Sequence, residues 1–138
     1  MSELVRLSVS IDKPLYEQLE KIVKTSGYQN RSEFLRDLVR DRLVKRQWDS
    51  NQEVVGTVTL VYDHHSRQLS DRLIHLAHDH HDVILSTTHV HLDRSMCAEV
   101  IIVKGLARRI EKLADLLGKQ KGVLHSALSM SSIGKGLA

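Results

Sequence analysis

Five of the nine histidines and the only cysteine of this 138-residue chain fall between positions 78 and 97. His78 begins this stretch, His89 and His91 follow two residues apart, and Cys97 ends it. Imidazole nitrogens and a thiolate sulfur together bind zinc, copper or nickel. A planar set of four ligands would favour nickel(II) or copper(II), whereas a tetrahedral set would favour zinc. The stretch therefore predicts a transition-metal site, and the spacing does not decide which of these metals it binds.

The elements expected around this stretch bring three of the ligands together. Residues 83–104 predict a strand, a turn at 93–95 and a returning strand. Residues two apart on a strand point to the same face, so His89 and His91 present adjacent imidazoles. The hairpin can bring the thiolate of Cys97 to the same side. Glu99 shares the face of Cys97. It is not expected to bind the metal itself, but it could orient a ligand imidazole by accepting a hydrogen bond from it.

A fourth ligand is expected from the helix that precedes the hairpin. His75 and His78 lie three residues apart near the end of that helix, so one of them could face a metal. His78 is favoured because it belongs to the dense run of histidines. His80 and His81 are expected to be polar groups at a helix end, with weak secondary metal binding as the alternative. The sequence assigns no role to the remaining histidines, which are His64, His65, His75 and His125.

The second half of the chain alternates between the periods of strands and helices. Strands are predicted over 54–62, 83–92, 96–104 and 123–130, and helices over 69–77 and 106–117. This β-α-β-β-α-β order predicts an α+β sandwich of the ferredoxin-like type, with two helices covering one face of four strands. The glycine-containing tail after Ser131 is expected to fray.

The first fifty residues predict one strand and two helices. Apolar and polar side chains alternate over residues 5–11, which indicates a strand. A first helix is expected after Asp12 and Pro14, and a capping box at residues 30–33 begins a second. Residues 47–53 are polar and indicate a linker. The single strand has no partner within these fifty residues, so a second copy of the chain would pair with it as an antiparallel ribbon.

A short strand followed by two helices joined through residues 27–33 resembles the ribbon-helix-helix DNA-binding proteins. The resemblance implies that a dimeric ribbon enters the major groove and reads base edges, and a two-stranded ribbon fits that groove. The start of the second helix would offer backbone donors to a DNA phosphate. The expected DNA contacts are Arg6, Ser8 and Ser10 on the ribbon, with Asn30, Arg31 and Ser32 at the helix start.

The histidine and cysteine pattern behind that segment is similar to the nickel-responsive transcriptional regulators, along nearly the whole chain. The resemblance implies an ACT-type C-terminal domain that assembles as a homotetramer, a dimer of dimers. It implies nickel(II) held in a plane by His89, His91 and Cys97 of one chain and His78 of another. It also implies operator DNA as a partner and repression of nickel-uptake genes.

Two further expectations come with this resemblance. Glu33 and Asp37 match acidic positions of an additional, low-affinity cation site near the DNA-binding half. The domains are expected to be a ribbon-helix-helix domain over 1–48, a linker over 49–53 and a metal-binding and tetramerisation domain over 54–138.

Composition limits the classes of protein to which the chain could belong. A net charge of +3 makes the chain only mildly basic. No apolar run is long enough for a membrane span, and the first residues do not resemble a signal peptide, so a cytoplasmic protein without a membrane partner is expected.

Two other classes use a histidine and cysteine cluster: a metalloenzyme with Cys97 as ligand or nucleophile, and a metal-storage or chaperone protein. The chain has no His-Glu-x-x-His helix, and four protein ligands leave no open position for a substrate. A storage protein would not need the arginine-bearing ribbon. The sequence therefore favours a regulator that is not an enzyme.

Overall fold

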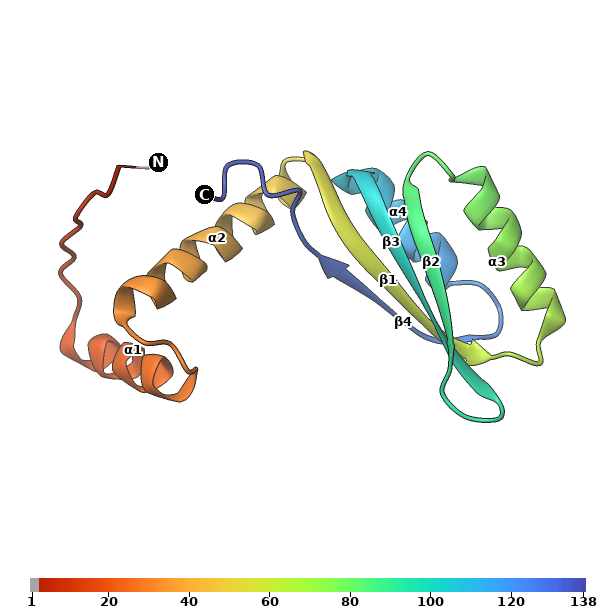
Figure 1. The fold of residues 1–138 in the computed structure, drawn as a ribbon, viewed down its shortest axis with the longest axis horizontal. Helices are drawn as coiled ribbons and strands as arrows, with labels where there is room; N and C mark the ends of the chain where they lie inside the picture. The colour runs from red at the N-terminus through yellow and green to blue at the C-terminus, as the bar shows by residue number, and fades with distance from the viewer. Residues whose placement is uncertain (1–2) are drawn as a thin grey trace. The chain divides into compact units, whose positions relative to one another are not determined.

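The structure is a computed structural model that describes residues 3–138 (Figure 1). The chain divides into two compact units. One contains the residues up to Leu43 together with Gly136–Ala138, and the other contains Val44–Lys135. Within residues 3–138, no helix is long and apolar enough to cross a membrane.

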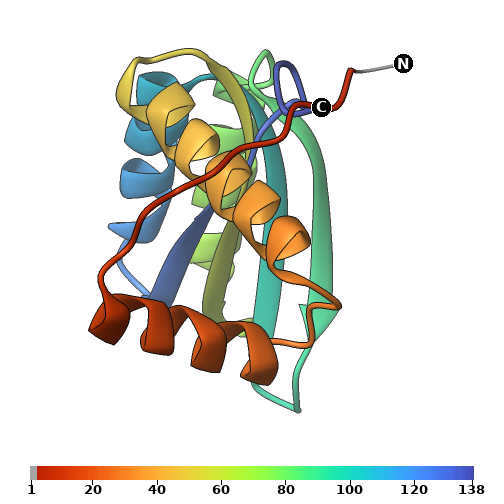
Figure 2. The same ribbon diagram turned by 90° about the vertical axis from the view of Figure 1, so that its left-hand side faces the viewer.

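The second unit has the predicted β-α-β-β-α-β order. Its strands form one antiparallel sheet in the order β2-β3-β1-β4. Helices α3 and α4 lie on the same face of this sheet (Figures 1 and 2). The elements are β1 (Glu53–Asp63), α3 (Arg67–Asp79), β2 (Ile84–His91), β3 (Met96–Leu106), α4 (Ala107–Gly118) and β4 (Val123–Met130).

The core of this unit lies between the sheet and its two helices. Every second residue of β1 is buried, from Val54 to Tyr62, because successive strand residues face opposite sides of the sheet. Burying one leucine, isoleucine or valine side chain contributes about 1.5–3 kcal/mol. The helices contribute Leu69 and Leu73 of α3 and Ile110, Leu113 and Leu117 of α4 to this core.

The first unit contains α1 (Lys13–Thr25) and the first turns of α2 (Arg31–Asp49). Gly27 ends the first helical segment with a left-handed φ of 76°. Asn30 caps α2, since its Oδ1 accepts a hydrogen bond from the backbone N–H of Glu33 at 3.0 Å. The predicted capping residue is therefore confirmed.

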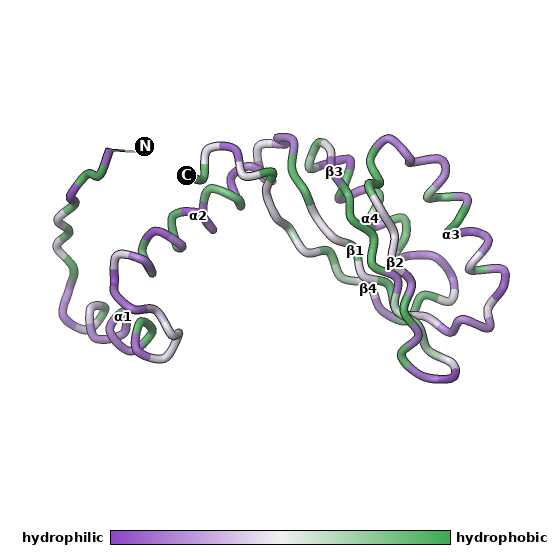
Figure 3. Tube along the Cα trace, viewed as in Figure 1, coloured by the Kyte–Doolittle hydropathy of each residue, from purple (hydrophilic) through white to green (hydrophobic). Residues whose placement is uncertain are grey.

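The predicted strand over residues 5–11 does not form in the single chain. Residues 3–12 adopt neither helix nor strand, and the side chains of Val5 and Leu7 are 86% and 83% exposed. A strand needs hydrogen-bond partners for its backbone, and this segment finds none within one chain. Figure 3 shows apolar and polar positions alternating along it. Pairing with a second chain stays a prediction.

The residues around Trp48 correct two expectations. The polar composition of residues 47–53 indicated a linker, but α2 continues through Asp49 and the Trp48 side chain is buried in the core of the second unit. The indole N–H of Trp48 donates to the carbonyl of Ser131 at 2.8 Å, and the Ser132 hydroxyl donates to Gln47 at 2.8 Å. The tail expected to fray is thus held against the end of α2.

Candidate metal centre

Three of the four predicted ligands lie on one face of the hairpin of β2 and β3. In the register of this hairpin, His91 lies opposite Cys97 and His89 lies opposite Glu99. Directly opposed residues of an antiparallel pair point to the same side, so all four side chains share one face. The ring centroids of His89 and His91 are 5.3 Å apart, and both rings are exposed. Two imidazoles and one thiol therefore face the same side of the sheet at one of its ends.

The Cys97 thiol lies at the buried edge of this group. It donates a hydrogen bond to the backbone carbonyl of Tyr62, with a distance of 3.4 Å between sulfur and oxygen. Burial raises the pKa of the Cys97 thiol above its usual value. Only the thiolate binds a metal, so metal binding must displace this proton.

His78 lies near the other end of β2. It belongs to the last turn of α3, and the loop after it leads directly into β2, where the backbone N–H of Ile84 donates to the carbonyl of His80. His89 follows Ile84 by five residues, roughly 17 Å along a strand that rises about 3.3 Å per residue. In a single chain, no group of three or more His, Cys, Asp or Glu residues among positions 3–138 is placed to hold a metal ion.

His80 and His81 stabilise the loop beside His78. A ring nitrogen of His80 donates to the carbonyl of Leu76 at 2.9 Å, and one of His81 donates to the carbonyl of His78 at 3.0 Å. These bonds satisfy carbonyls that a helix end leaves unpaired. The position of both residues agrees with the expectation of polar groups at a helix end.

His64 packs against a predicted ligand, which the sequence did not suggest. Its ring centroid is 4.9 Å from that of His91, with the rings edge to face. The backbone N–H of His64 also donates to the carbonyl of Ser95 at 2.9 Å, which ties the end of β1 to the turn of the hairpin. No local pattern indicates this contact, because it depends on which strands become neighbours.

The predicted DNA contacts all belong to the first unit. Arg31 is engaged within that unit, since it donates to the Tyr16 hydroxyl at 2.9 Å and lies 3.3 Å from the Glu20 carboxylate. The Asn30 side chain is used as a helix cap. The remaining residues are exposed, namely Arg6, Ser8, Ser10 and Ser32.

Glu33 and Asp37 lie four residues apart on α2 and therefore share a face of the helix. The Asp37 carboxylate accepts hydrogen bonds from the Tyr28 hydroxyl at 2.7 Å and from Arg40 at 2.9 Å. The bond from Tyr28, followed by the bond from Arg40, lowers the pKa of Asp37. The Asp37 carboxylate is thus held in place by two donors within one chain.

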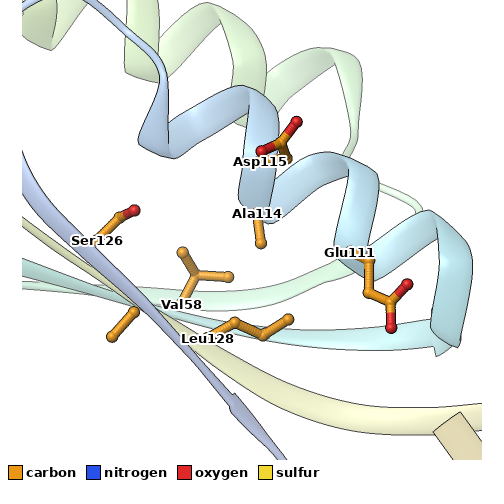
Figure 4. A pocket seen from close by; sticks show the side chains of 7 residues that line it. Val58, Glu111, Ala114, Asp115, Ser126 and Leu128 are labelled. Carbon is orange, nitrogen blue, oxygen red and sulfur yellow. The ribbon is translucent and has the colours of Figure 1, made fainter.

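A pocket of about 220 Å³ lies between α4 and the strands β1 and β4. Figure 4 shows Glu111 and Asp115 projecting from α4 at its rim. Asp115 is paired with Lys119 at 2.6 Å. This pocket contains none of the predicted metal ligands and is lined by Val58, Glu111, Ala114, Asp115, Ser126, Ala127 and Leu128.

Each of the two units matches a known protein family. Residues 5–46 match the ribbon-helix-helix protein, copG family, and residues 55–131 match the NikR C-terminal nickel binding domain. The chain is 49% identical over 138 residues to a nickel-responsive regulator of Geobacter sulfurreducens, and the match covers 99% of each chain. The chain belongs to the nickel-responsive regulator family.

Other nickel-responsive regulators are similarly close. The match in Syntrophus aciditrophicus is 47% identical over 135 residues, which is 98% of each chain. The match in Pyrococcus abyssi is 47% identical over 136 residues, or 98% of this chain and 99% of the relative. This nickel-responsive regulator therefore combines a DNA-binding domain with a nickel-binding domain and is not an enzyme.

One solved structure shares part of the fold of this nickel-responsive regulator. It is an uncharacterized protein from Thermotoga maritima, with a TM-score of 0.52 over 57% of this chain and 98% of that one. At 18% sequence identity, the likeness concerns the fold alone.

Proposed function

We propose that this protein represses nickel-uptake genes by binding operator DNA when nickel(II) occupies a site shared between two chains. The observation that carries this proposal is the separation of His78 from the hairpin ligands along β2. A planar centre needs four ligands around one metal ion. Because one chain offers three of them at one end of β2 and the fourth near the other end, a second chain is the natural source of His78.

In the proposed site, His89, His91 and Cys97 of one chain bind nickel together with His78 of the partner subunit. The donor set suits nickel(II), since imidazole and thiolate are ligands that it accepts readily. Nickel would supply a fixed centre that joins two chains. Four chains, arranged as a dimer of dimers, would then hold two ribbon-helix-helix pairs in a defined arrangement.

The DNA-binding half is proposed to act as a dimer whose ribbon enters the major groove. Its apolar side chains support this, because Val5, Leu7 and Val9 are 69–86% exposed in one chain and would be covered by a second. Arg6, Ser8 and Ser10 would then face the base edges. The start of α2, with Asn30, Arg31 and Ser32, would lie beside a phosphate.

Nickel can change DNA affinity only if it favours the arrangement of chains that binds DNA. We propose that joining the metal-binding halves gives that arrangement, so operator DNA would in turn raise the affinity for nickel. Glu33 and Asp37 are proposed as a weaker cation site on the DNA-binding half. The regulator would work in the cytoplasm, where its operator is accessible.

A DNA-binding titration tests this function. Operator sequences would first be selected from random duplexes with the nickel-loaded protein. Gel shifts would then compare the wild type, Cys97→Ala and Thr88→Ala with and without nickel. Thr88 is an exposed residue of β2, the strand that pairs with the strand of Cys97, and is the matched control.

We expect nickel to increase operator affinity in the wild type and in Thr88→Ala by roughly 5–150-fold, the usual range of coupling between two sites. Cys97→Ala should keep its fold by circular dichroism and lose the increase. If nickel increases the operator affinity of Cys97→Ala as much as that of the wild type, the proposal is wrong.

A further inference from the structure

Tyr62 touches the hairpin at two points. It lies on β1 directly opposite Cys97 of β3, and its side chain is only 1% exposed. Its backbone carbonyl accepts the hydrogen bond of the Cys97 thiol. Its hydroxyl donates to Oε2 of Glu99 at 2.6 Å. One buried residue therefore contacts both a predicted ligand and the carboxylate beside the ligands.

Glu99 in turn lies next to a predicted ligand. It is the register partner of His89 and points to the same face of the sheet. The ring of Tyr62 meets the ring of His89 edge to face, with 6.1 Å between centroids. Tyr62, Glu99 and His89 thus form one group across three neighbouring strands.

We propose that Tyr62 is a positioning residue of the nickel site, which holds Glu99 so that its carboxylate orients the imidazole of His89. This inference rests on the proposed nickel site. A metal-bound histidine usually donates its other ring N–H to a carboxylate or carbonyl, which fixes its tautomer and orientation. The Tyr62 hydroxyl occupies Oε2 of Glu99 and leaves Oε1 able to accept from His89.

The need for Tyr62 follows from the position of Glu99. A glutamate has three side-chain torsions, and Glu99 is only half-buried, so its carboxylate would otherwise turn toward water. Tyr62 is fixed by the core around it and its hydroxyl is a short, charge-assisted donor to the carboxylate. The rigid tyrosine therefore fixes the flexible glutamate.

The test compares Tyr62→Phe with the wild type in the full chain. Phenylalanine keeps the ring in the core and removes only the hydroxyl. Nickel affinity would be measured by competition with a chelator, and the thiolate-to-nickel absorption would report the geometry of the site. In the metal-free protein, ¹⁵N chemical shifts of the His89 ring would report its tautomer.

We expect Tyr62→Phe to bind nickel about 10–100-fold more weakly, the usual effect of losing such an outer partner. The His89 ring should change from one dominant tautomer to a mixture. Tyr28→Phe is the control, because it loses a similar hydrogen bond from tyrosine to a carboxylate, that of Asp37, in the other unit. The control should keep the wild-type thiolate-to-nickel absorption and the wild-type affinity of that site.

Glu99→Gln gives a second route to the same answer if Tyr62→Phe does not fold. The neutral amide is a weaker acceptor than the carboxylate and replaces one of its two acceptor oxygens by a donor, so nickel binding should weaken here too. In a double-mutant cycle, Tyr62→Phe should add nothing once Glu99 is replaced, because Tyr62 acts through Glu99. Additive losses would contradict this mechanism.

Cys97→Ala, measured in parallel, separates the two proposals. If Cys97→Ala loses tight nickel binding while Tyr62→Phe and Glu99→Gln bind nickel normally, the role of Tyr62 is overturned and the site stands. If Cys97→Ala binds nickel as tightly as the wild type, the proposed site itself is overturned, and the role of Tyr62 with it.

Discussion

The Val44–Lys135 unit buries fifteen apolar side chains in a single cluster, whereas the described part of the unit before it buries one, that of Phe34. The N-terminal unit instead exposes apolar side chains along residues 4–11 and on both of its helices. A unit of about forty residues rarely has enough interior to fold alone. We therefore expect the N-terminal unit to depend on a second chain for its stability.

The C-terminal unit has the opposite deficiency. Its fold is complete in one chain, but its predicted ligands are divided between the two ends of β2. One unit thus lacks part of its core and the other lacks part of its metal site. In our account, association of chains completes both the core of the N-terminal unit and the metal site of the C-terminal unit. Nickel binding and DNA binding are therefore connected through the assembly of chains.

The largest effect is expected from Leu7→Asp, which places a charge on the apolar face of the ribbon. Burying an unpaired carboxylate between two chains is very unfavourable, so dimerisation of the N-terminal unit and specific DNA binding should be lost. The thermal transition of the C-terminal unit should not change. Calorimetry, sedimentation and gel shifts would measure these effects.

Arg6→Ala is the matched control for Leu7→Asp, because Arg6 is the neighbouring residue on the polar face of the ribbon. It should lose sequence preference and keep the dimer. A Leu7→Asp protein that still binds its operator would show that the N-terminal unit does not depend on the ribbon.

A smaller effect, confined to the other unit, is expected from Leu113→Ala. Leu113 is 2% exposed in the core beneath α4, and truncating such a leucine costs about 2–5 kcal/mol. Leu116→Ala on the same helix, at a position 39% exposed, should cost about 1 kcal/mol or less. Denaturant unfolding would compare them. Equal losses would contradict the core described for this unit.

The smallest effect concerns the pH dependence of the N-terminal unit. Hydrogen bonds from Tyr28 and Arg40 lower the pKa of Asp37 in the folded state. The carboxylate therefore contributes stability above its unfolded pKa of about 3.9, and this contribution is lost as pH falls through the folded value. Asp37→Asn should lower the thermal midpoint at pH 7 and have no effect near pH 2.

The exposed Asp41→Asn, on the same helix, is the control for that series. The measurements need a buffer without divalent cations, since Asp37 belongs to the proposed weak cation site. If the difference in thermal midpoint between Asp37→Asn and the wild type grows as the pH falls, the prediction is contradicted.

The sequence predicted most of the C-terminal unit because its signals are local. Alternation along β1 and the turn at residues 93–95 mark strands and their ends without knowledge of any distant residue. The grouping of His89, His91 and Cys97 follows from the same hairpin. Local spacing also suffices for the Asn30 cap, since a cap and its partner lie within one turn.

The features that were missed depend on long-range register or on another chain. The bond between Tyr62 and Glu99 requires that β1 and β3 pair with Leu60 opposite Glu99, which no local pattern contains. Trp48 was assigned to a linker because its neighbours are polar, although its side chain reaches the core. The ribbon strand has a clear pattern but forms no strand in one chain.

The central claim, that two chains complete each nickel site, can be tested by mixing two inactive variants. His78→Ala keeps the hairpin and lacks the fourth ligand, while Cys97→Ala keeps His78 and lacks the thiolate. Each alone should lack the thiolate-to-nickel absorption of the wild type. After the two are unfolded and refolded together in equal amounts, about a quarter of the sites should regain it, since the symmetric assembly then pairs intact halves at random. If the mixture regains none, or if His78→Ala alone keeps the wild-type absorption, the ligands are not shared between chains and the account is wrong.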